Sequence, residues 1–115
     1  MGRTLKKIVA AFYRTPVGTE PVRDWLKALS SEDRGDIGQD IATVEYGWPV
    51  GMPVCRPLGR GLWEVRSNVS DNRIARIIFC IACGQMILLH AFIKKTQSAP
   101  QEDLALARKR MREIE

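Results

Sequence analysis

The stretch "RIARIIFCIACGQMILLHAFIKKT", residues 73–96, decides the fold. Two almost continuously apolar runs, rich in β-branched residues, flank the dipeptide Cys83-Gly84. Such runs on either side of a two-residue turn predict a β-hairpin whose strands lie at the centre of a sheet. The second run also contains the only histidine of the chain, His90, and it ends on Lys94 and Lys95.

Further strands precede this hairpin. Residues 54–58 and 62–69 have the composition of strands, and the short segments Gly-Arg-Gly (59–61) and Ser-Asp-Asn (70–72) supply turns between them and to residue 73. Near the N-terminus, residues 6–14 form a β-branched and aromatic run that ends before Pro16, which predicts a first strand.

Helical periodicity appears in three other segments. In residues 19–29 the apolar positions share one helix face, with Thr19 as the expected N-cap, and a second helix follows Ser31 and closes at Gly47. The last helix follows a capping-box pattern of Ser98 and Gln101. The expected order is β-α-α-β-β-β-β-α, a single α+β domain over residues 1–115. We expect a mostly antiparallel sheet, an N-terminal αα-hairpin and a C-terminal helix, with all helices on one face.

Composition indicates an ordinary globular protein. The chain has 115 residues, 45% of them hydrophobic and 27% charged, and it contains no apolar run long enough for a transmembrane helix. Without a recognisable signal peptide, we expect a cytoplasmic protein. The three cysteines, an odd number with a single histidine, favour buried thiols over disulfides or a zinc site.

Positive charge is concentrated in the middle of the chain. Residues 55–95 hold seven basic side chains against Glu64 and Asp71, which accounts for the whole net charge of +5. This distribution suits either a surface for an anionic ligand or a solvated rim, and charge alone does not distinguish them. The seven basic residues are Arg56, Arg60, Arg66, Arg73, Arg76, Lys94 and Lys95.

Strand alternation predicts which basic residues share a side. The predicted sets are Leu62, Glu64 and Arg66; Ile74, Arg76 and Ile78; and Leu88, His90, Phe92 and Lys94. An unpaired buried cation is costly, and two acidic residues are too few to pair with all the basic ones. We therefore expect an open groove on the sheet, lined by Arg66, Arg76 and the lysine pair, with the helices on the opposite face. Arginines of this kind suit phosphate groups.

Three motifs carry a resemblance to a known family. "LWEVR" (62–66), a strand containing "ARIIF" (75–79) and the block "LHAFIKKTQSAP" (89–100) resemble the toxins of the RelE/HigB superfamily, particularly the phage-associated HigB-type killer proteins. The resemblance extends over about residues 6–113 in element order. The chain departs from the family in lacking the tyrosines often seen on the "ARIIF" strand.

The resemblance implies a toxin of a type II toxin–antitoxin system. Such a toxin is a ribosome-dependent mRNA endoribonuclease without a metal or organic cofactor. Its implied partners are an antitoxin with a helix-turn-helix domain, the ribosomal A site and mRNA, and it meets operator DNA only through the antitoxin. The alternative is a catalytically inactive module of the same fold that binds nucleic acid or a partner, which the missing tyrosines favour.

Cleavage through the 2′-OH of RNA requires a base, a stabiliser of the charged phosphorane and an acid. By position, the resemblance implies catalytic roles for Arg66, Arg76, Lys94 and Lys95. His90 is either a proton-transfer residue or a hydrogen-bonded core residue. Consecutive lysines on a strand point opposite ways, so one of the two lines the groove, and which one stays open. For contacts to RNA we expect Arg56, Arg60 and Arg73.

Overall fold

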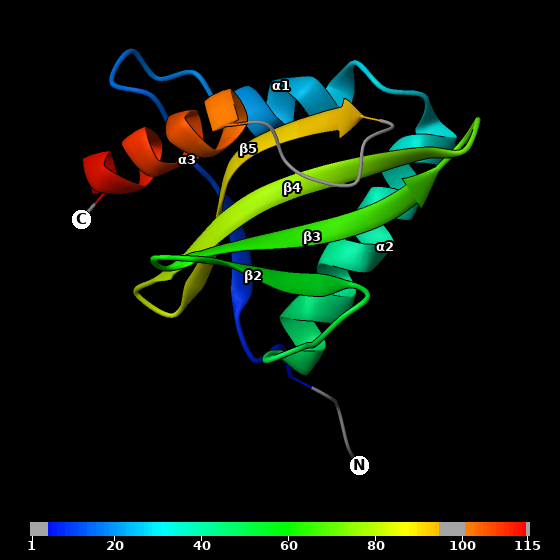
Figure 1. The fold of residues 1–115 in the computed structure, drawn as a ribbon, viewed down its shortest axis with the longest axis horizontal. Coiled ribbons are helices and arrows are strands. Elements are labelled where there is room, and N and C mark those ends of the chain that lie inside the picture. Colours follow the sequence, from blue (N-terminus) through cyan, green and yellow to red (C-terminus); the bar gives the residue numbers. More distant parts are fainter. Residues whose placement is uncertain (1–4, 95–100, 115) are drawn as a thin grey trace.

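A five-stranded mixed sheet forms the centre of the protein (Figure 1). The computed structural model describes residues 5–94 and 101–114. The strands are β1 (Val9–Phe12), β2 (Cys55–Gly59), β3 (Leu62–Val69), β4 (Arg73–Ala82) and β5 (Gln85–Lys94), in the spatial order β1-β5-β4-β3-β2. All neighbours are antiparallel except β1, which runs parallel to β5. The predicted fold class is confirmed, although β1 is shorter than the predicted 6–14.

Three helices complete the described chain: α1 (Pro21–Lys27), α2 (Ser31–Gly47) and α3 (Gln101–Ile114). The predicted element order is confirmed. None of these helices has the length and hydropathy that a membrane-spanning segment requires.

The predicted helix caps are wrong by one residue at two helices. Ser30, not Ser31, caps α2, because its Oγ accepts a hydrogen bond from the Asp33 N–H at 3.1 Å. The N-cap of α1 is Glu20, without a side-chain bond, while the Thr19 hydroxyl lies 2.6 Å from that of Thr15. The predicted cap Ser98 lies outside the described residues.

The hairpin turns are where the sequence predicts them. Arg60 and Gly61 join β2 to β3, and Cys83 and Gly84 join β4 to β5, all four with positive φ. Two consecutive residues of positive φ are the signature of a type I′ turn, whose twist matches that of the flanking strands.

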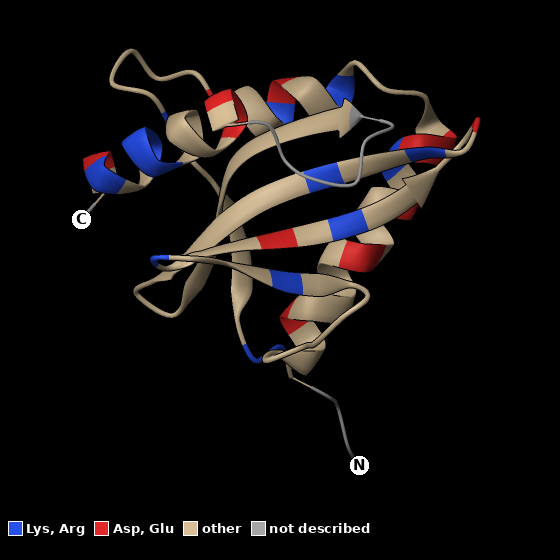
Figure 2. Ribbon diagram, viewed as in Figure 1, with Lys and Arg blue, Asp and Glu red and all other residues tan. Residues whose placement is uncertain are grey.

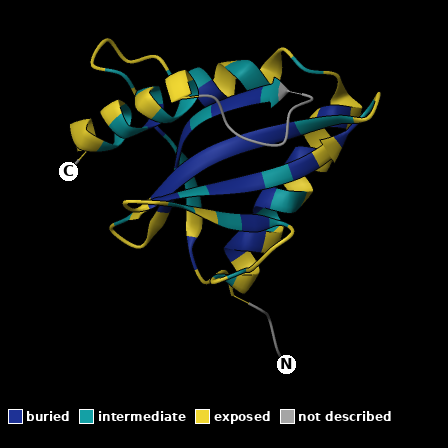
Figure 3. Cartoon of the chain, viewed as in Figure 1, coloured by how far each residue is buried: buried dark blue, intermediate teal, exposed yellow. Residues whose placement is uncertain are grey.

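The two faces of the sheet bury two separate apolar clusters, and this contradicts the expectation that all helices lie on one face. One cluster packs between the sheet and α1 and α2; the other includes Ala107, with Leu104 and Met111 against it, and so lies beneath α3. Figure 3 shows that the central strands are mostly buried. The residues facing α3 that make the second cluster include Leu62, Ile78, Cys80, Leu89 and Phe92. Arg76 lies on this same face, because its partner across the two strands is Phe92.

A β-bulge in β5 changes the side that one residue faces. Ile78 lies opposite His90 but Phe79 lies opposite Leu88, so Leu89 is the extra residue. Leu88 consequently packs in the cluster beneath α1 and α2, whereas Leu89 packs on the α3 side. The predicted sharing of a side by Leu88 and His90 is wrong for this reason.

Candidate functional site

A row of arginines crosses the sheet on the face that also carries α3. Arg56 of β2 lies opposite Glu64 of β3, and Arg66 of β3 lies directly opposite Arg76 of β4. Figure 2 shows the basic segments of β2, β3 and β4 lying side by side. Like charges directly opposite one another on a sheet repel, so this arrangement requires a compensating anion. Glu64 supplies that anion.

Arg76 is fully buried, and this corrects the prediction that its guanidinium lines an open groove. Its Nη1 lies 3.3 Å from Glu64 Oε1 and 3.5 Å from Oε2, and both side chains have an exposed fraction of 0%. A charge removed from water in this way persists only when it is paired and hydrogen-bonded. Glu64 thus holds Arg76 as the buried member of the row, whose guanidinium is not exposed to a ligand.

Arg66 is the half-buried arginine of the pair. Its backbone N–H donates to the Val54 carbonyl at 2.8 Å, just before β2 begins. Its side chain lines a pocket at the edge of β3, together with Asp40, Pro53, Val54 and Asn68. Of the two central arginines, Arg66 is therefore the one that a ligand reaches.

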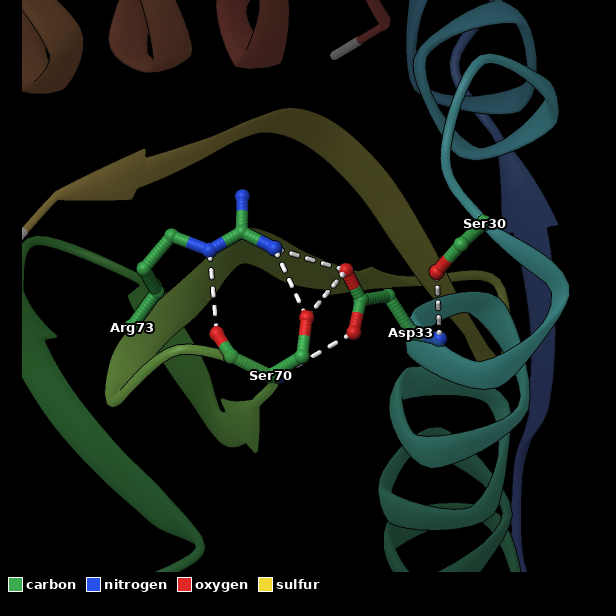
Figure 4. Close-up of polar contacts among 4 residues, drawn as sticks. All are labelled: Ser30, Asp33, Ser70 and Arg73. Carbon is green, nitrogen blue, oxygen red and sulfur yellow. Dashed lines mark hydrogen bonds and ion pairs between the residues drawn. The ribbon is translucent and has the colours of Figure 1, made fainter.

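Arg73 lies on the opposite side and is held by α2 (Figure 4). Its Nη2 donates to Asp33 Oδ2 at 2.8 Å, and its Nε donates to the Ser70 carbonyl at 3.0 Å. Asp33 also accepts hydrogen bonds from the backbone and hydroxyl of Ser70. The Ser70 N–H lowers the pKa of Asp33, with further lowering by the Ser70 hydroxyl and Arg73. The structure does not bring Arg73 together with the arginine row.

His90 is bound to α3. Its Nε2 lies 2.6 Å from Asp103 Oδ1, and its ring lies 5.6 Å from that of Phe92. Asp103 thus links α3 to β5. This contact favours the structural interpretation of His90. The sequence does place an acidic residue in the first turn of the helix that follows the histidine strand. An acid at that position is common, because it interacts favourably with the helix dipole, so it does not by itself predict a contact with His90.

The remaining predicted residues are spread over the sheet. Arg60 is exposed in the β2–β3 turn, whose Gly61 lies close to Met111 of α3. Lys94 is the last residue of β5, and its Cα lies opposite that of Ile74. Lys95 lies outside the described residues.

Residues 108–112, near the end of α3, contain four basic side chains, and one of them, Arg110, packs against the sheet. Arg110 Nη1 donates to the Leu89 carbonyl at 2.8 Å, and its guanidinium lies 5.3 Å from the centre of the Tyr13 ring. Tyr13 donates a short hydrogen bond to Glu113, which, with burial, raises the pKa of Tyr13. These contacts hold the helix against the strand rather than presenting Arg110 to a ligand.

Possible metal ligands and the three cysteines were located in the described part of the chain. No group of three or more His, Cys, Asp or Glu side chains lies there in an arrangement that could hold a metal ion. Cys55 and Cys80 are buried, as predicted, whereas Cys83 is exposed, because it occupies the hairpin turn.

The comparison with protein families identifies one match. The family described as phage derived protein Gp49-like (DUF891) matches residues 24–112, which include α2, all the strands except β1 and nearly all of α3. The comparison with curated proteins gives no match.

Proposed function

Because the chain belongs to the Gp49-like family of phage-derived proteins, which is part of the RelE/HigB-like toxin family, we propose that it is the toxin of a type II toxin–antitoxin system. Its proposed activity is ribosome-dependent cleavage of mRNA. The antitoxin would carry a helix-turn-helix domain and neutralise the toxin, and operator DNA would be met only through the antitoxin. The proposed place of action is the ribosomal A site in the cytoplasm.

The observation that carries this proposal is the arginine row on the sheet. Arg66 lies directly opposite Arg76, with Arg56 one strand further and Lys94 at the end of the neighbouring β5. Guanidinium groups on a sheet face suit bidentate contacts with the phosphates of a single strand. Glu64 neutralises one of the arginines, so the row attracts phosphate without the full repulsion of three cations.

The chemistry would use the RNA's own nucleophile. The 2′-oxygen attacks the adjacent phosphorus, the bond from phosphorus to the 5′-oxygen breaks, and the products are a 2′,3′-cyclic phosphate and a free 5′-hydroxyl. Arg66 would stabilise the negative charge that develops on the phosphorane oxygens. Lys94 or Lys95 would take the proton from the 2′-hydroxyl and return one to the leaving oxygen. His90 is the weaker candidate, because its Nε2 is bound to Asp103.

We expect cleavage to depend on the ribosome, because the proposed site does not include a strong base. A site without a strong base gains most from a message held in the geometry of attack, since fixed orientation replaces a large part of the barrier. The ribosome would provide that orientation in the A site.

Expression from a tightly repressed promoter tests the proposal. We expect wild-type protein to arrest growth, Arg66→Ala to relieve the arrest, and Arg23→Ala to leave it unchanged, because Arg23 is exposed on α1, which packs on the other face. Co-expression of a neighbouring helix-turn-helix gene is expected to restore growth. Growth unaffected by folded wild-type protein would contradict the proposal.

One observation favours a second candidate, a module of the same fold that binds nucleic acid or a partner without cleaving. Arg76, one of the two arginines expected to stabilise the transition state, is buried against Glu64. A row with a single accessible central arginine would suffice for binding. Growth arrest without RNA cleavage would identify this candidate.

A further inference from the structure

The edge of β3 beyond the end of β2 carries a pocket of mixed chemistry. The paired register of β2 and β3 ends at Cys55 and Val65, and a pocket lies just beyond this point, beside Arg66 and Asn68 of β3. The pocket is lined by one basic, one acidic and one amide residue and by two apolar residues. The lining residues are Arg66, Asp40, Asn68, Pro53 and Val54.

Several contacts hold this pocket in shape. Asp40 of α2 accepts a hydrogen bond from the Ser67 hydroxyl at 2.6 Å, which fixes its carboxylate against the strand. The Val54 carbonyl accepts from the backbone of Arg66, which fixes the preceding loop against the same strand. The Asp40 carboxylate and the loop at Val54 are thus positioned before a ligand arrives, and this reduces the entropy lost on binding.

The chemistry of the lining matches a nucleobase. Pro53 and Val54 offer apolar surface to the flat face of a base, while Asp40 and Asn68 offer hydrogen-bonding groups to its edge. An ionised carboxylate has lone pairs on both oxygens, so its contact with Ser67 leaves acceptor capacity on Asp40. Among the four RNA bases, guanine presents two adjacent N–H donors to such an acceptor and a carbonyl oxygen to an amide donor. Arg66 stands at the boundary between the pocket and the arginine row.

We propose that this pocket binds the base of a nucleotide whose phosphate lies on Arg66, and that it prefers guanine. The inference rests on the proposed function, because it assigns to the nuclease a pocket that selects where the message is cut. Asp40 and Asn68 are then specificity-determining residues. Arg66 belongs both to the pocket and to the arginine row.

Binding of single nucleotides tests the pocket without any cleavage. Isotope-labelled protein is titrated with GMP, AMP, CMP and UMP, and NMR shifts of the Asn68 side-chain amide and the Val54 backbone amide are followed. We expect GMP to bind about tenfold more tightly than the other three, the discrimination typical of one good bidentate base contact. Asp40→Asn is expected to remove this preference, since the amide replaces one acceptor by a donor. Equal binding of all four nucleotides would overturn the proposal.

A matched control and a second measurement separate this inference from the proposed function. Asp36→Asn changes an exposed carboxylate one turn earlier on α2 and is expected to keep the GMP preference. In a purified translation system, Asp40→Asn is expected to move the cuts away from codons containing guanine, and an unchanged cut pattern would overturn the role in specificity. If wild-type protein makes no cuts at all, the proposed nuclease fails, while the nucleotide titration still decides the pocket.

Discussion

At the scale of single residues, three carboxylates determine what the basic side chains do. Each joins a residue predicted to act on RNA to another part of the fold or to a neighbouring strand. The pairs are Asp33 with Arg73, Glu64 with Arg76, and Asp103 with His90. Arg66 forms no ion pair among the described residues, and for this reason the proposed site is built around it.

The contacts of Asp33 with Ser70 and Arg73 make the stability of the fold depend on pH. Its pKa in the folded protein is lowered from the ordinary 3.8, so the ionised carboxylate stabilises the fold fully above pH 3.8. This contribution disappears as the pH falls through the lowered value. We expect Asp33→Asn to melt at a lower temperature than wild type at pH 7, and the two melting curves to converge below pH 3.8. A gap that persists in acid would contradict the assignment, and Asp36→Asn serves as control.

The buried pair of Glu64 and Arg76 predicts a strong loss of stability when either partner is removed. Arg76→Ala or Glu64→Gln is expected to lower the free energy of unfolding by about 3 kcal/mol or more, because the remaining group is left uncompensated in the interior. Urea denaturation measures this loss. The double variant Glu64→Gln with Arg76→Ala should lose less than the two single losses added together. Strict additivity would show that the two side chains do not act as a pair.

The three thiols differ in accessibility, and this gives a simple check of the burial pattern. Burial raises the pKa of Cys55 to about 11, and Cys80 is also buried, whereas Cys83 is exposed in a turn. A thiol reagent applied to native protein at pH 8 should modify one cysteine quickly, and Cys83→Ser should remove this reaction. Rapid modification of two or more thiols in the native state would contradict the packing.

At the scale of elements, short turns and one bulge fix the register of the sheet. The turn at Cys83 and Gly84 is recognisable in the sequence, because a dipeptide that contains glycine separates two apolar runs. The bulge at Leu89 is not, since nothing in an apolar run marks the extra residue. Period-two alternation therefore assigns the side of Phe92 correctly and that of Leu88 wrongly.

Replacement of glycine by alanine is expected to change the stability of the protein in opposite directions at positions 84 and 38. Gly84 has φ +73° in the turn, so Gly84→Ala should destabilise the protein by about 1 kcal/mol. Gly38 lies in α2, and a Cβ added there would meet no atom within 4 Å outside the helix backbone, so Gly38→Ala should stabilise by about 1 kcal/mol through helix propensity. Chemical denaturation of both variants provides the comparison. Equal signs would contradict the turn or the helix.

At the scale of the whole molecule, the sheet separates a packing face from a face shared by α3 and the arginine row. The sequence predicts the order of elements, because periodicity, caps and turns are local signals. It does not predict that α3 packs on the same face as Arg66, nor that Glu64 and Asp33 take Arg76 and Arg73 as partners. Those outcomes depend on contacts between distant segments. Counting only acidic residues near the basic ones overlooked Asp33, which lies on α2.

We propose that Arg66, on this shared face, is the residue on which ribosome-dependent cleavage of mRNA depends. Primer extension on a defined mRNA in a purified translation system tests it most directly, with wild type, Arg66→Ala and the control Arg23→Ala, each with and without ribosomes. Circular dichroism establishes that all three are folded. We predict cuts in phase with codons that require ribosomes, are unaffected by Arg23→Ala and fall roughly a hundredfold with Arg66→Ala. No cuts by folded wild-type protein, or equal cutting by Arg66→Ala, would contradict the claim.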